Sequence, residues 1–317
     1  MSVSSQVAAG SEAVQETRGR RGKAPLSEGK RAERRLGWLL VAPAVIVMVA
    51  VTGYPVGYAI FLSLERYNLE LPQDIKFIGF SNYAAVLSSP YWWQALKVTV
   101  IITVFSVAIS LVLGMLLAQI MFRTIFGRGW VRTASLVPYG IVTVAAAYGW
   151  QYAWTPGQGY LSAAFNNSAP LTSEIQAIMV IIVAEIWKTT PFMGLLLLAG
   201  LSLVPEDLQK AAKVDGATAW QRFTQITLPL MKPAILVAVL FRTLDSFRIF
   251  DNIFILTAGN NNTGSVSILG WDNMFSALNL GVGSAISILI FICVVIISFV
   301  FIKIFGTAAP GADMGKR

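Results

Sequence analysis

Long apolar segments alternate with short polar ones along most of this chain, and their lengths determine the predicted fold. Each apolar segment reaches or exceeds the roughly 20 residues that a helix needs to cross a hydrocarbon layer about 30 Å thick. We therefore predict an all-α integral membrane protein with six transmembrane helices. The predicted helices occupy residues 36–64, 94–121, 133–154, 176–203, 233–257 and 283–305.

Both ends of the chain are polar. Residues 1–35 are rich in Gly, Ser, Ala, Arg and Lys with almost no large apolar side chain, so we predict a disordered basic tail. A cleavable signal peptide would need a short apolar region near the start, whereas the first apolar segment begins at Leu36 and continues past Leu62. The six-helix domain is expected to cover residues 36–307, followed by a short tail at 308–317.

The distribution of basic residues predicts the orientation of the helices. Six helices place both termini on one side of the membrane. That side would carry 18 basic residues: eight in the tail, three in 122–132, four in 204–232 and three after 302. The loops of the other side carry two, Arg66 and Lys76. Because basic loops are retained inside the cell, both termini and the loop at 203–229 are predicted to be cytoplasmic.

Composition excludes several classes of function. Hydrophobic residues make up 56% of the chain, against roughly 45–50% in soluble domains. The net charge of +8 does not indicate nucleic-acid binding, because eight of the 24 basic residues precede Leu36, next to the membrane and its lipids. Histidine is absent and Cys293 is the single cysteine, which argues against metal sites, disulfides and histidine-based catalysis. No Gly-x4-Gly-Lys-Ser/Thr sequence occurs, so we predict no enzyme activity and no bound cofactor.

The segment 203–229 is a polar interruption between two apolar segments. Pro205 suits the first position of a helix, and the two acidic residues after it complement the helix N-terminus. Gly216 can end this helix before a second one begins. Trp220 and Phe223 are three residues apart in the second helix, which gives it an aromatic face suited to a groove on another protein.

The spacing within this segment resembles a known motif. Ala211-Ala212, Gly216, Ile226 and Leu228-Pro229 are separated by three, nine and one residues, as in the EAA loop of the membrane subunits of ABC importers. The resemblance implies a type I ABC-importer permease fold in the bacterial plasma membrane. It also implies a coupling helix at 215–223 that contacts an ATPase subunit. Lys210 stands where the family usually has glutamate. The coupling residues implied are Ala211, Ala212, Asp215, Gly216, Trp220, Phe223, Leu228 and Pro229.

Charged residues inside two predicted helices are the candidate solute-binding groups. A charge near the centre of a membrane helix costs roughly 2.5–3.5 kcal/mol, so such residues should pair, face the bundle interior or line water. Three pairs of opposite charges are spaced three residues apart, which lets them meet on one helix face. They are Glu185 with Lys188, Arg242 with Asp245, and Arg248 with Asp251.

Helical spacing places the first two of these pairs on two stripes that combine polar groups with an apolar wall, an arrangement suited to a hydroxylated solute such as a sugar. The segment 187–192 also resembles a Trp-x-x-x-Pro-Phe/Tyr segment of sugar permeases, whose sugar contacts lie along the same two helices. An alternative interpretation is that the charges are structural ion pairs between kinked helices. The predicted substrate path comprises Glu185, Lys188, Thr189, Phe192, Arg242, Asp245, Ser246, Ile249 and Asn252.

The resemblance also implies the partners and the mechanism. A permease of this family works with a second, similar permease, two ATP-binding subunits that hold ATP and Mg²⁺, and an extracytoplasmic sugar-binding lipoprotein. ATP-driven closure of the ATPase subunits would then produce alternating access. A proton-coupled secondary transporter is the leading alternative, since Glu185, Asp245 and Asp251 could titrate in the membrane. An integral membrane enzyme ranks third, because the aqueous loops lack catalytic groups.

Overall fold

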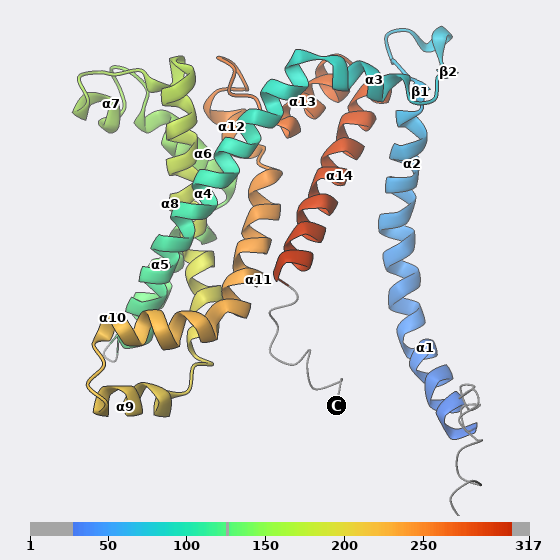
Figure 1. Cartoon of the computed structure of the whole chain (residues 1–317). Coiled ribbons are helices and arrows are strands. Elements are labelled where there is room, and N and C mark those ends of the chain that lie inside the picture. The colour runs from blue at the N-terminus through green and yellow to red at the C-terminus, as the bar shows by residue number, and fades with distance from the viewer. Residues whose placement is uncertain (1–27, 125–126, 306–317) are drawn as a thin grey trace, which may run out of the picture. The chain divides into compact units, whose positions relative to one another are not determined.

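The structure of the chain, a computed structural model, describes residues 28–124 and 127–305 (Figure 1). Most of the predicted N-terminal tail and all of the predicted C-terminal tail lie outside these residues. The chain divides into two compact units, one ending at Gly57 and the other beginning at Tyr58.

The first unit is helical. Its helix begins at Glu28, inside the segment predicted to be disordered. Pro55 lacks the N–H that would bond to the carbonyl of Val51, and a widened turn at this position accommodates the lost bond. Arg35–Ser63 is long and apolar enough to cross a membrane, as predicted for 36–64. The elements are α1 (Glu28–Met48), the π-helical turn η1 (Val49–Gly53) and α2 (Tyr54–Ser63), which continues into the second unit.

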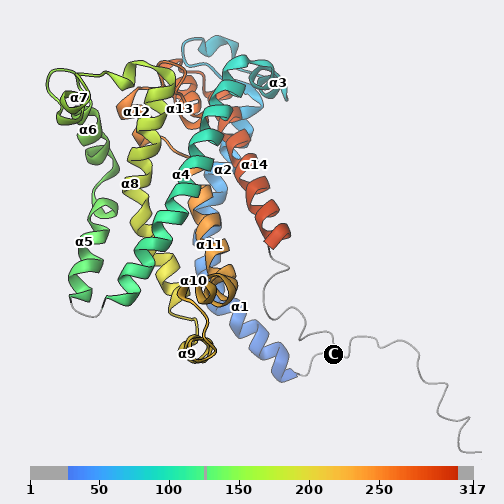
Figure 2. The same cartoon turned by 60° about the vertical axis from the view of Figure 1, so that its left-hand side comes forward.

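Long helices in the second unit run between the same two ends of this unit (Figures 1 and 2). They are long and apolar enough to cross a membrane. Among the described residues of the whole chain, five helices are long and apolar enough, and one of them is Arg35–Ser63. The long helices of the second unit are α4 (Pro90–Arg123), α8 (Glu174–Leu201), α11 (Leu228–Phe247) and α14 (Leu280–Phe305).

Short elements lie at the two ends of the second unit. A two-stranded antiparallel hairpin pairs Glu65 with Phe77 and Arg66 with Lys76. Figure 1 shows this hairpin, α3, α7, α12 and α13 at one end and α9 and α10 at the other. The strands and 3-10 turns are β1 (Glu65–Arg66), η2 (Pro72–Asp74), β2 (Lys76–Phe77) and η3 (Pro170–Thr172). The other short elements are α3 (Ser81–Ser88), α5 (Arg128–Gly140), α6 (Thr143–Ala153), α7 (Tyr160–Ala164), α9 (Glu206–Val214), α10 (Ala219–Arg222), the π-helical turns η4 (Phe223–Thr227) and η5 (Asp272–Ser276), α12 (Asp251–Leu256) and α13 (Val266–Trp271).

The predicted helix at 133–154 is interrupted, so the prediction of one continuous helix there is wrong. α5 ends at Gly140 and α6 begins at Thr143, with Ile141 and Val142 in extended conformations. The local sequence explains the break. Pro138 weakens the end of α5, Gly140 disfavours a helix, and four consecutive β-branched residues follow it.

The predicted helix at 233–257 is also two helices. α11 ends at Phe247, and α12 begins only at Asp251. The backbone between them needs hydrogen-bond partners other than those of a regular helix, and the Ser265 hydroxyl donates to the carbonyl of Ile249 at 2.9 Å. Arg248 and Asp251 therefore lie on either side of a helix break rather than on one helix face.

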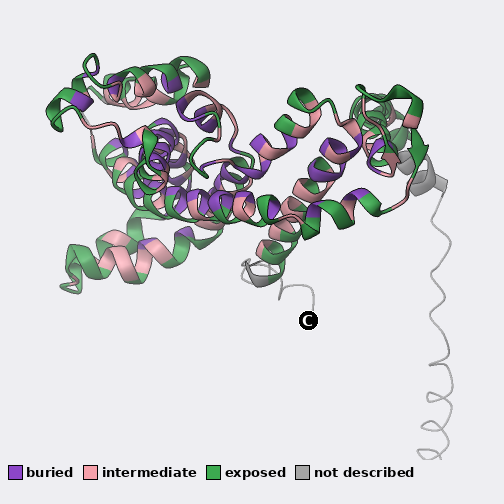
Figure 3. Ribbon diagram, turned by 90° about the horizontal axis from the view of Figure 1, so that it is seen from above, coloured by how far each residue is buried: buried purple, intermediate pink, exposed green. Residues whose placement is uncertain are grey.

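The packing of α4 against α8 forms the centre of the second unit. A Cβ atom added at Gly114 would lie 2.7 Å from Met193 Cγ and 3.2 Å from the backbone nitrogen of Gly194, so the two backbones touch. Figure 3 shows buried residues gathered where the helices pack together. Large apolar side chains such as Val112 (61% exposed) and Leu116 (53%) on α4 remain outside this packing, as expected for a surface that contacts lipid.

Candidate functional site

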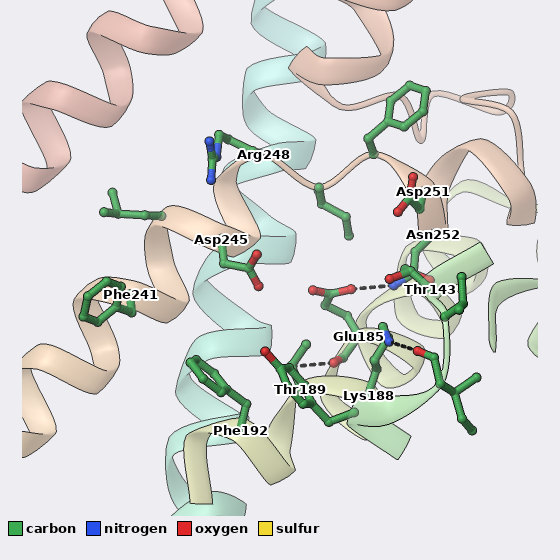
Figure 4. Close-up of a pocket in the computed structure, with 16 residues that line it drawn as sticks. Thr143, Glu185, Lys188, Thr189, Phe192, Phe241, Asp245, Arg248, Asp251 and Asn252 are labelled. Atoms are coloured by element: carbon green, nitrogen blue, oxygen red, sulfur yellow. Dashed lines mark hydrogen bonds between the residues drawn. The ribbon is translucent and has the colours of Figure 1, made fainter. Parts of the chain in front are cut away.

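A cavity of about 900 Å³ lies in the second unit, bounded by α8, α11 and the two helix interruptions (Figure 4). The break between α5 and α6 supplies one part of its wall, and the break between α11 and α12 supplies another. Its lining residues are Tyr139, Ile141, Val142, Thr143, Glu185, Lys188, Thr189, Phe192, Phe241, Leu244, Asp245, Arg248, Ile249, Phe250, Asp251 and Asn252.

A network of ionised groups connects three helices at the cavity. Arg242 of α11 is almost fully buried and donates to Glu185 of α8 at 2.8 Å. It also donates to Asp245, one turn further along α11, at 2.8 Å. The second carboxylate oxygen of Glu185 accepts a hydrogen bond from Asn252 of α12 (Figure 4). The network therefore holds α8, α11 and α12 together through one guanidinium and one carboxylate.

The ion pairs agree with the sequence prediction only in part. The predicted pair between Arg242 and Asp245 is confirmed. The predicted pair between Glu185 and Lys188 is wrong, because both oxygens of Glu185 are engaged with other helices. The ion pairs within the described ranges also include none between Arg248 and Asp251, which the helix break separates.

Lys188 is turned toward the interrupted segment between α5 and α6. It is buried within the second unit, with a relative exposure of 8%. The Lys188 ammonium donates to the backbone carbonyl of Ile141 at 2.5 Å (Figure 4). The charge is thus placed against a backbone acceptor that the helix break leaves free.

An aromatic and aliphatic wall completes the cavity. Phe192 stacks on Tyr139 of α5 with ring centroids 5.1 Å apart. Phe250 lies in the break after α11 and stacks on Phe254 at 5.2 Å. Thr189 lines the same space, but its hydroxyl donates to the carbonyl of Glu185 at 2.6 Å. The cavity therefore offers ring surfaces beside a small number of polar groups.

Most of the predicted substrate-path residues line this cavity, but two do not. Arg242 lies behind the wall as the partner of two lining carboxylates. Ser246 is fully buried and shares a hydrogen bond of 3.0 Å with Ser106 of α4. The residues that line the cavity are Glu185, Lys188, Thr189, Phe192, Asp245, Ile249 and Asn252.

Sequence reasoning missed the part of the lining that comes from the helix breaks. Assigning 133–154 to one continuous helix hid the contribution of residues 139–143. The run of β-branched residues after Gly140 was the available signal. Phe241 and Leu244 neighbour the predicted stripe, and a wider stripe would have included them. The lining residues outside the predicted substrate path, of which Arg248 and Asp251 were expected as an ion pair, are Tyr139, Ile141, Val142, Thr143, Phe241, Leu244, Arg248, Phe250 and Asp251.

The polar interruption at 203–229 forms two helices joined at a glycine, as predicted. Gly216 has a φ of +81° and follows the end of α9; its N–H donates to the carbonyl of Lys213, and that of Ala217 donates to the carbonyl of Ala212. Thr218 caps α10 and exchanges reciprocal hydrogen bonds with Gln221. The turn between the helices is therefore built from backbone bonds that need a left-handed residue.

The aromatic face of this segment is present and partly exposed. The ring centroids of Trp220 and Phe223 are 5.8 Å apart. Trp220 is 71% exposed, whereas Phe223 packs against the core of the second unit. Helical structure continues without a gap from Ala219 to Phe247, so the second short helix is the beginning of a long one. Figure 1 shows α10 lying across the ends of the upright helices and α11 rising from it.

The predicted coupling residues are distributed over these elements. Ala211 and Ala212 lie in α9, and Asp215 caps its end before Gly216. Leu228 and Pro229 begin α11. Lys210 lies one turn from two acidic residues of α9, with its ammonium 3.4 Å from Glu206 and 3.8 Å from Asp207. The cation at this position is therefore balanced within its own helix.

Comparison with known proteins identifies the family. Residues 92–308 match the family described as the binding-protein-dependent transport system inner membrane component. The chain is 62% identical over 289 residues to the trehalose transport system permease protein SugA of Mycobacterium tuberculosis, covering 91% of this chain and 94% of SugA. It is 38% identical over 285 residues to the trehalose/maltose transport system permease protein MalF of Thermococcus litoralis, covering 88% and 96%.

A solved structure has the same fold. A chain of a bacterial alginate ABC transporter, crystallised with an alginate pentasaccharide-bound periplasmic protein, superposes with a TM-score of 0.74. The two chains are 22% identical, and the match covers 87% of this chain and 96% of the other. The observed architecture is thus the ABC-importer permease fold. The chain is a multi-pass permease, a transport subunit rather than an enzyme, and it belongs to the family of inner-membrane components of binding-protein-dependent transport systems.

Proposed function

We propose that this chain is a translocation subunit of an ATP-driven importer for trehalose or another disaccharide. The observation that carries the proposal is the charge balance of the cavity. The charged groups that line the cavity, together with Arg242 behind them, are three cations and three anions, and three of the six form one ion-pair network around the buried Arg242. A neutral solute fits such a site better than an ion. The groups are Lys188, Arg242, Arg248, Glu185, Asp245 and Asp251.

The size and lining of the cavity also favour a sugar. Its volume of about 900 Å³ falls within the roughly 300–1,000 Å³ of pockets that bury small ligands. Phe192 and Tyr139 supply ring surfaces for the apolar faces of a sugar, while Asp245 and Asn252 supply hydrogen-bond partners for hydroxyls. The names of the relatives SugA and MalF, a trehalose permease and a trehalose/maltose permease, support the choice of disaccharide.

The wider assembly is part of the proposal. We infer six membrane crossings, made by the five long apolar helices and the interrupted α5–α6 segment. Both termini would then lie in the cytoplasm. A second, similar permease would cover the open side of the cavity. The exposure of Asp245 supports this inference: its side chain is 68% exposed at membrane depth, where a carboxylate facing lipid would be costly. Two ATP-binding subunits and an extracytoplasmic sugar-binding lipoprotein would complete the complex.

The coupling mechanism follows from the continuity of one helix. The exposed Trp220 and the buried Arg242 belong to the same helical stretch, Ala219–Phe247. An ATPase subunit that moves α10 would therefore move the wall of the cavity through α11. This motion would expose the cavity alternately to the two sides of the membrane.

Transport into sealed vesicles tests the proposal. Vesicles containing the chain with its partner permease and ATPase subunits, together with the binding protein, are supplied with labelled trehalose. We expect uptake only with ATP, and competition by neutral disaccharides but not by a sugar phosphate. Uptake driven by a proton gradient without ATP would instead support the secondary transporter and contradict the proposal.

A further inference from the structure

The two interruptions that border the cavity are attached to the same helix. Glu185 and Lys188 lie one turn apart on α8, yet they reach different elements. Glu185 contacts α11 and α12, which flank one break. Lys188 contacts the other break at Ile141. α8 thus holds both irregular walls of the cavity by charged side chains.

The partners of Glu185 leave Lys188 without the carboxylate that lies one turn away on the same helix. One oxygen of Glu185 accepts from Arg242, and the other accepts from Asn252. A buried ammonium at membrane depth needs an electronegative partner, because desolvating a charge is costly. The carbonyl of Ile141 supplies that partner, so the contact is part of how the charge is accommodated.

The carbonyl of Ile141 in turn needs a donor from outside its own segment. In a continuous helix it would accept from the N–H of Ala145, but α6 begins only at Thr143. The first bond of the new helix runs from Ala146 to the carbonyl of Val142, one residue later. A backbone acceptor left free in a membrane protein has to be satisfied by another group. Lys188 is the group that satisfies it.

We propose that Lys188 is a positioning residue for transport, and that its ammonium acts by holding the segment 141–143 in place as a wall of the cavity. The inference deepens the proposed function, since it assumes that the cavity receives the solute. It assigns Lys188 a different task from the other polar lining groups. Asp245 and Asn252 meet solute hydroxyls, whereas Lys188 sets the position of the backbone that faces them.

Thiol labelling in the absence of any solute tests this assignment. Cys293, the single cysteine, is first replaced by Ser, and Val142→Cys then places one thiol on the wall, where Val142 is 71% exposed. The assembled complex in vesicles is treated with a membrane-impermeant maleimide, without ATP. Lys188→Met should alter the labelling rate at position 142 severalfold, because freeing the segment 141–143 changes the position of the thiol and the approach of the reagent to it.

Three controls separate positioning from general damage. Lys97→Met, the same change at an exposed position of α4, should leave the labelling rate at 142 unchanged. A thiol introduced by Phe241→Cys, on the α11 wall, should label at the same rate whether or not the chain also carries Lys188→Met. Lys188→Arg, which keeps a cationic donor, should return labelling at 142 toward the parent rate.

The outcomes are distinct. Unchanged labelling at 142 in Lys188→Met, together with a raised KM for uptake, would make Lys188 a direct solute contact and overturn the proposal. A changed labelling rate at both 142 and 241 would mean a loosened fold and would also overturn it, as would a Lys188→Arg chain that labels like Lys188→Met. A parent complex that imports neither trehalose nor another disaccharide would refute the proposed function alone, because the labelling comparison requires no solute.

Discussion

Arg242 is an unusual residue for a membrane helix, since its side chain is only 1% exposed and pairs with two carboxylates. Such a group is tolerated only while its partners remain. Glu185 lies with Arg242 inside the protein, while Asp245 is exposed at the cavity. The two carboxylates therefore have different tasks, one in the fold and one at the site, although the sequence presents them as equivalent acidic residues.

Removing the Arg242 cation should lower the stability of the protein, because Glu185 then remains buried without its partner. Arg242→Met leaves Glu185 buried without its counter-ion, and we expect a loss of stability of about 3–5 kcal/mol. The melting temperature of the detergent-solubilised chain is the measurement. The double variant Glu185→Gln/Arg242→Met should recover much of the loss, because no charge then remains unpaired inside the protein. A double variant no more stable than the single one would contradict this account.

Replacing Asp245, in contrast to replacing Arg242, should affect transport and leave stability nearly unchanged. Because its side chain is 68% exposed, Asp245→Asn should leave assembly and melting temperature nearly unchanged while sugar uptake is lost or strongly reduced. Expression, complex formation and uptake are measured in parallel. Loss of expression with no stable complex would instead assign Asp245 to the structural ion pairs.

At the level of single helices and turns, the coupling segment could be predicted well from the sequence, whereas the cavity could be predicted only in part. Gly216 and the capping residues of α10 act through local backbone geometry, which sequence spacing predicts directly. The interruptions at 141–142 and 248–250 are different, because the local sequence can weaken a helix but a distant donor satisfies the backbone carbonyl that each break leaves free. Lys188 and Ser265 supply those donors, and nothing in the local sequence indicates them.

The turn at Gly216 gives a direct test of coupling. Gly216→Pro cannot adopt the φ of +81° and loses the N–H that bonds to Lys213, so the orientation of α10 relative to α9 should change. We expect an assembled complex whose ATP hydrolysis is no longer linked to uptake. Gly216→Asn is the matched control, since Asn tolerates left-handed backbone. Normal solute-stimulated uptake in the Pro variant would refute the coupling role.

The small hairpin of β1 and β2 should respond to pH. Asp74 bonds to Arg66 and Lys76, each at 2.9 Å, and these hydrogen bonds and charges hold the pKa of Asp74 below its usual value. The folded-state pKa is depressed, so the contribution to local stability is present above the ordinary pKa of an aspartate and is lost as pH falls through the lowered value.

Limited proteolysis of this loop measures the effect. Cleavage within 65–77 should accelerate as pH falls through the lowered pKa of Asp74, using an acid-active protease whose rate is corrected on an unstructured peptide. Asp74→Asn should be cleaved faster at neutral pH and should show little further change with acidification. If the cleavage rates of the parent chain and of Asp74→Asn depended on pH in the same way, Asp74 would not be the group responsible.

At the scale of the whole molecule, hydropathy predicted the class of protein because the membrane constrains every crossing segment in the same way. The apolar segments at 36–64, 94–121, 176–203 and 283–305 correspond to long helices in the structure. The two segments that proved to be interrupted both line the cavity, together with the continuous helix α8. Their apolar character is sufficient for a membrane crossing, but it carries no information on whether their backbones remain helical throughout.

The contact between Gly114 and Gly194 sets a limit on how this molecule can move. At this contact a Cβ atom on Gly114 would already collide with Met193 and with the backbone of Gly194, so sliding α4 along α8 would drive the Cβ atoms of the next turn into these atoms. We therefore expect α4 and α8 to travel as one rigid body during a transport cycle. The deformation must then be concentrated elsewhere, at 141–142 and 248–250, where the backbone hydrogen bonding of the helices is already interrupted.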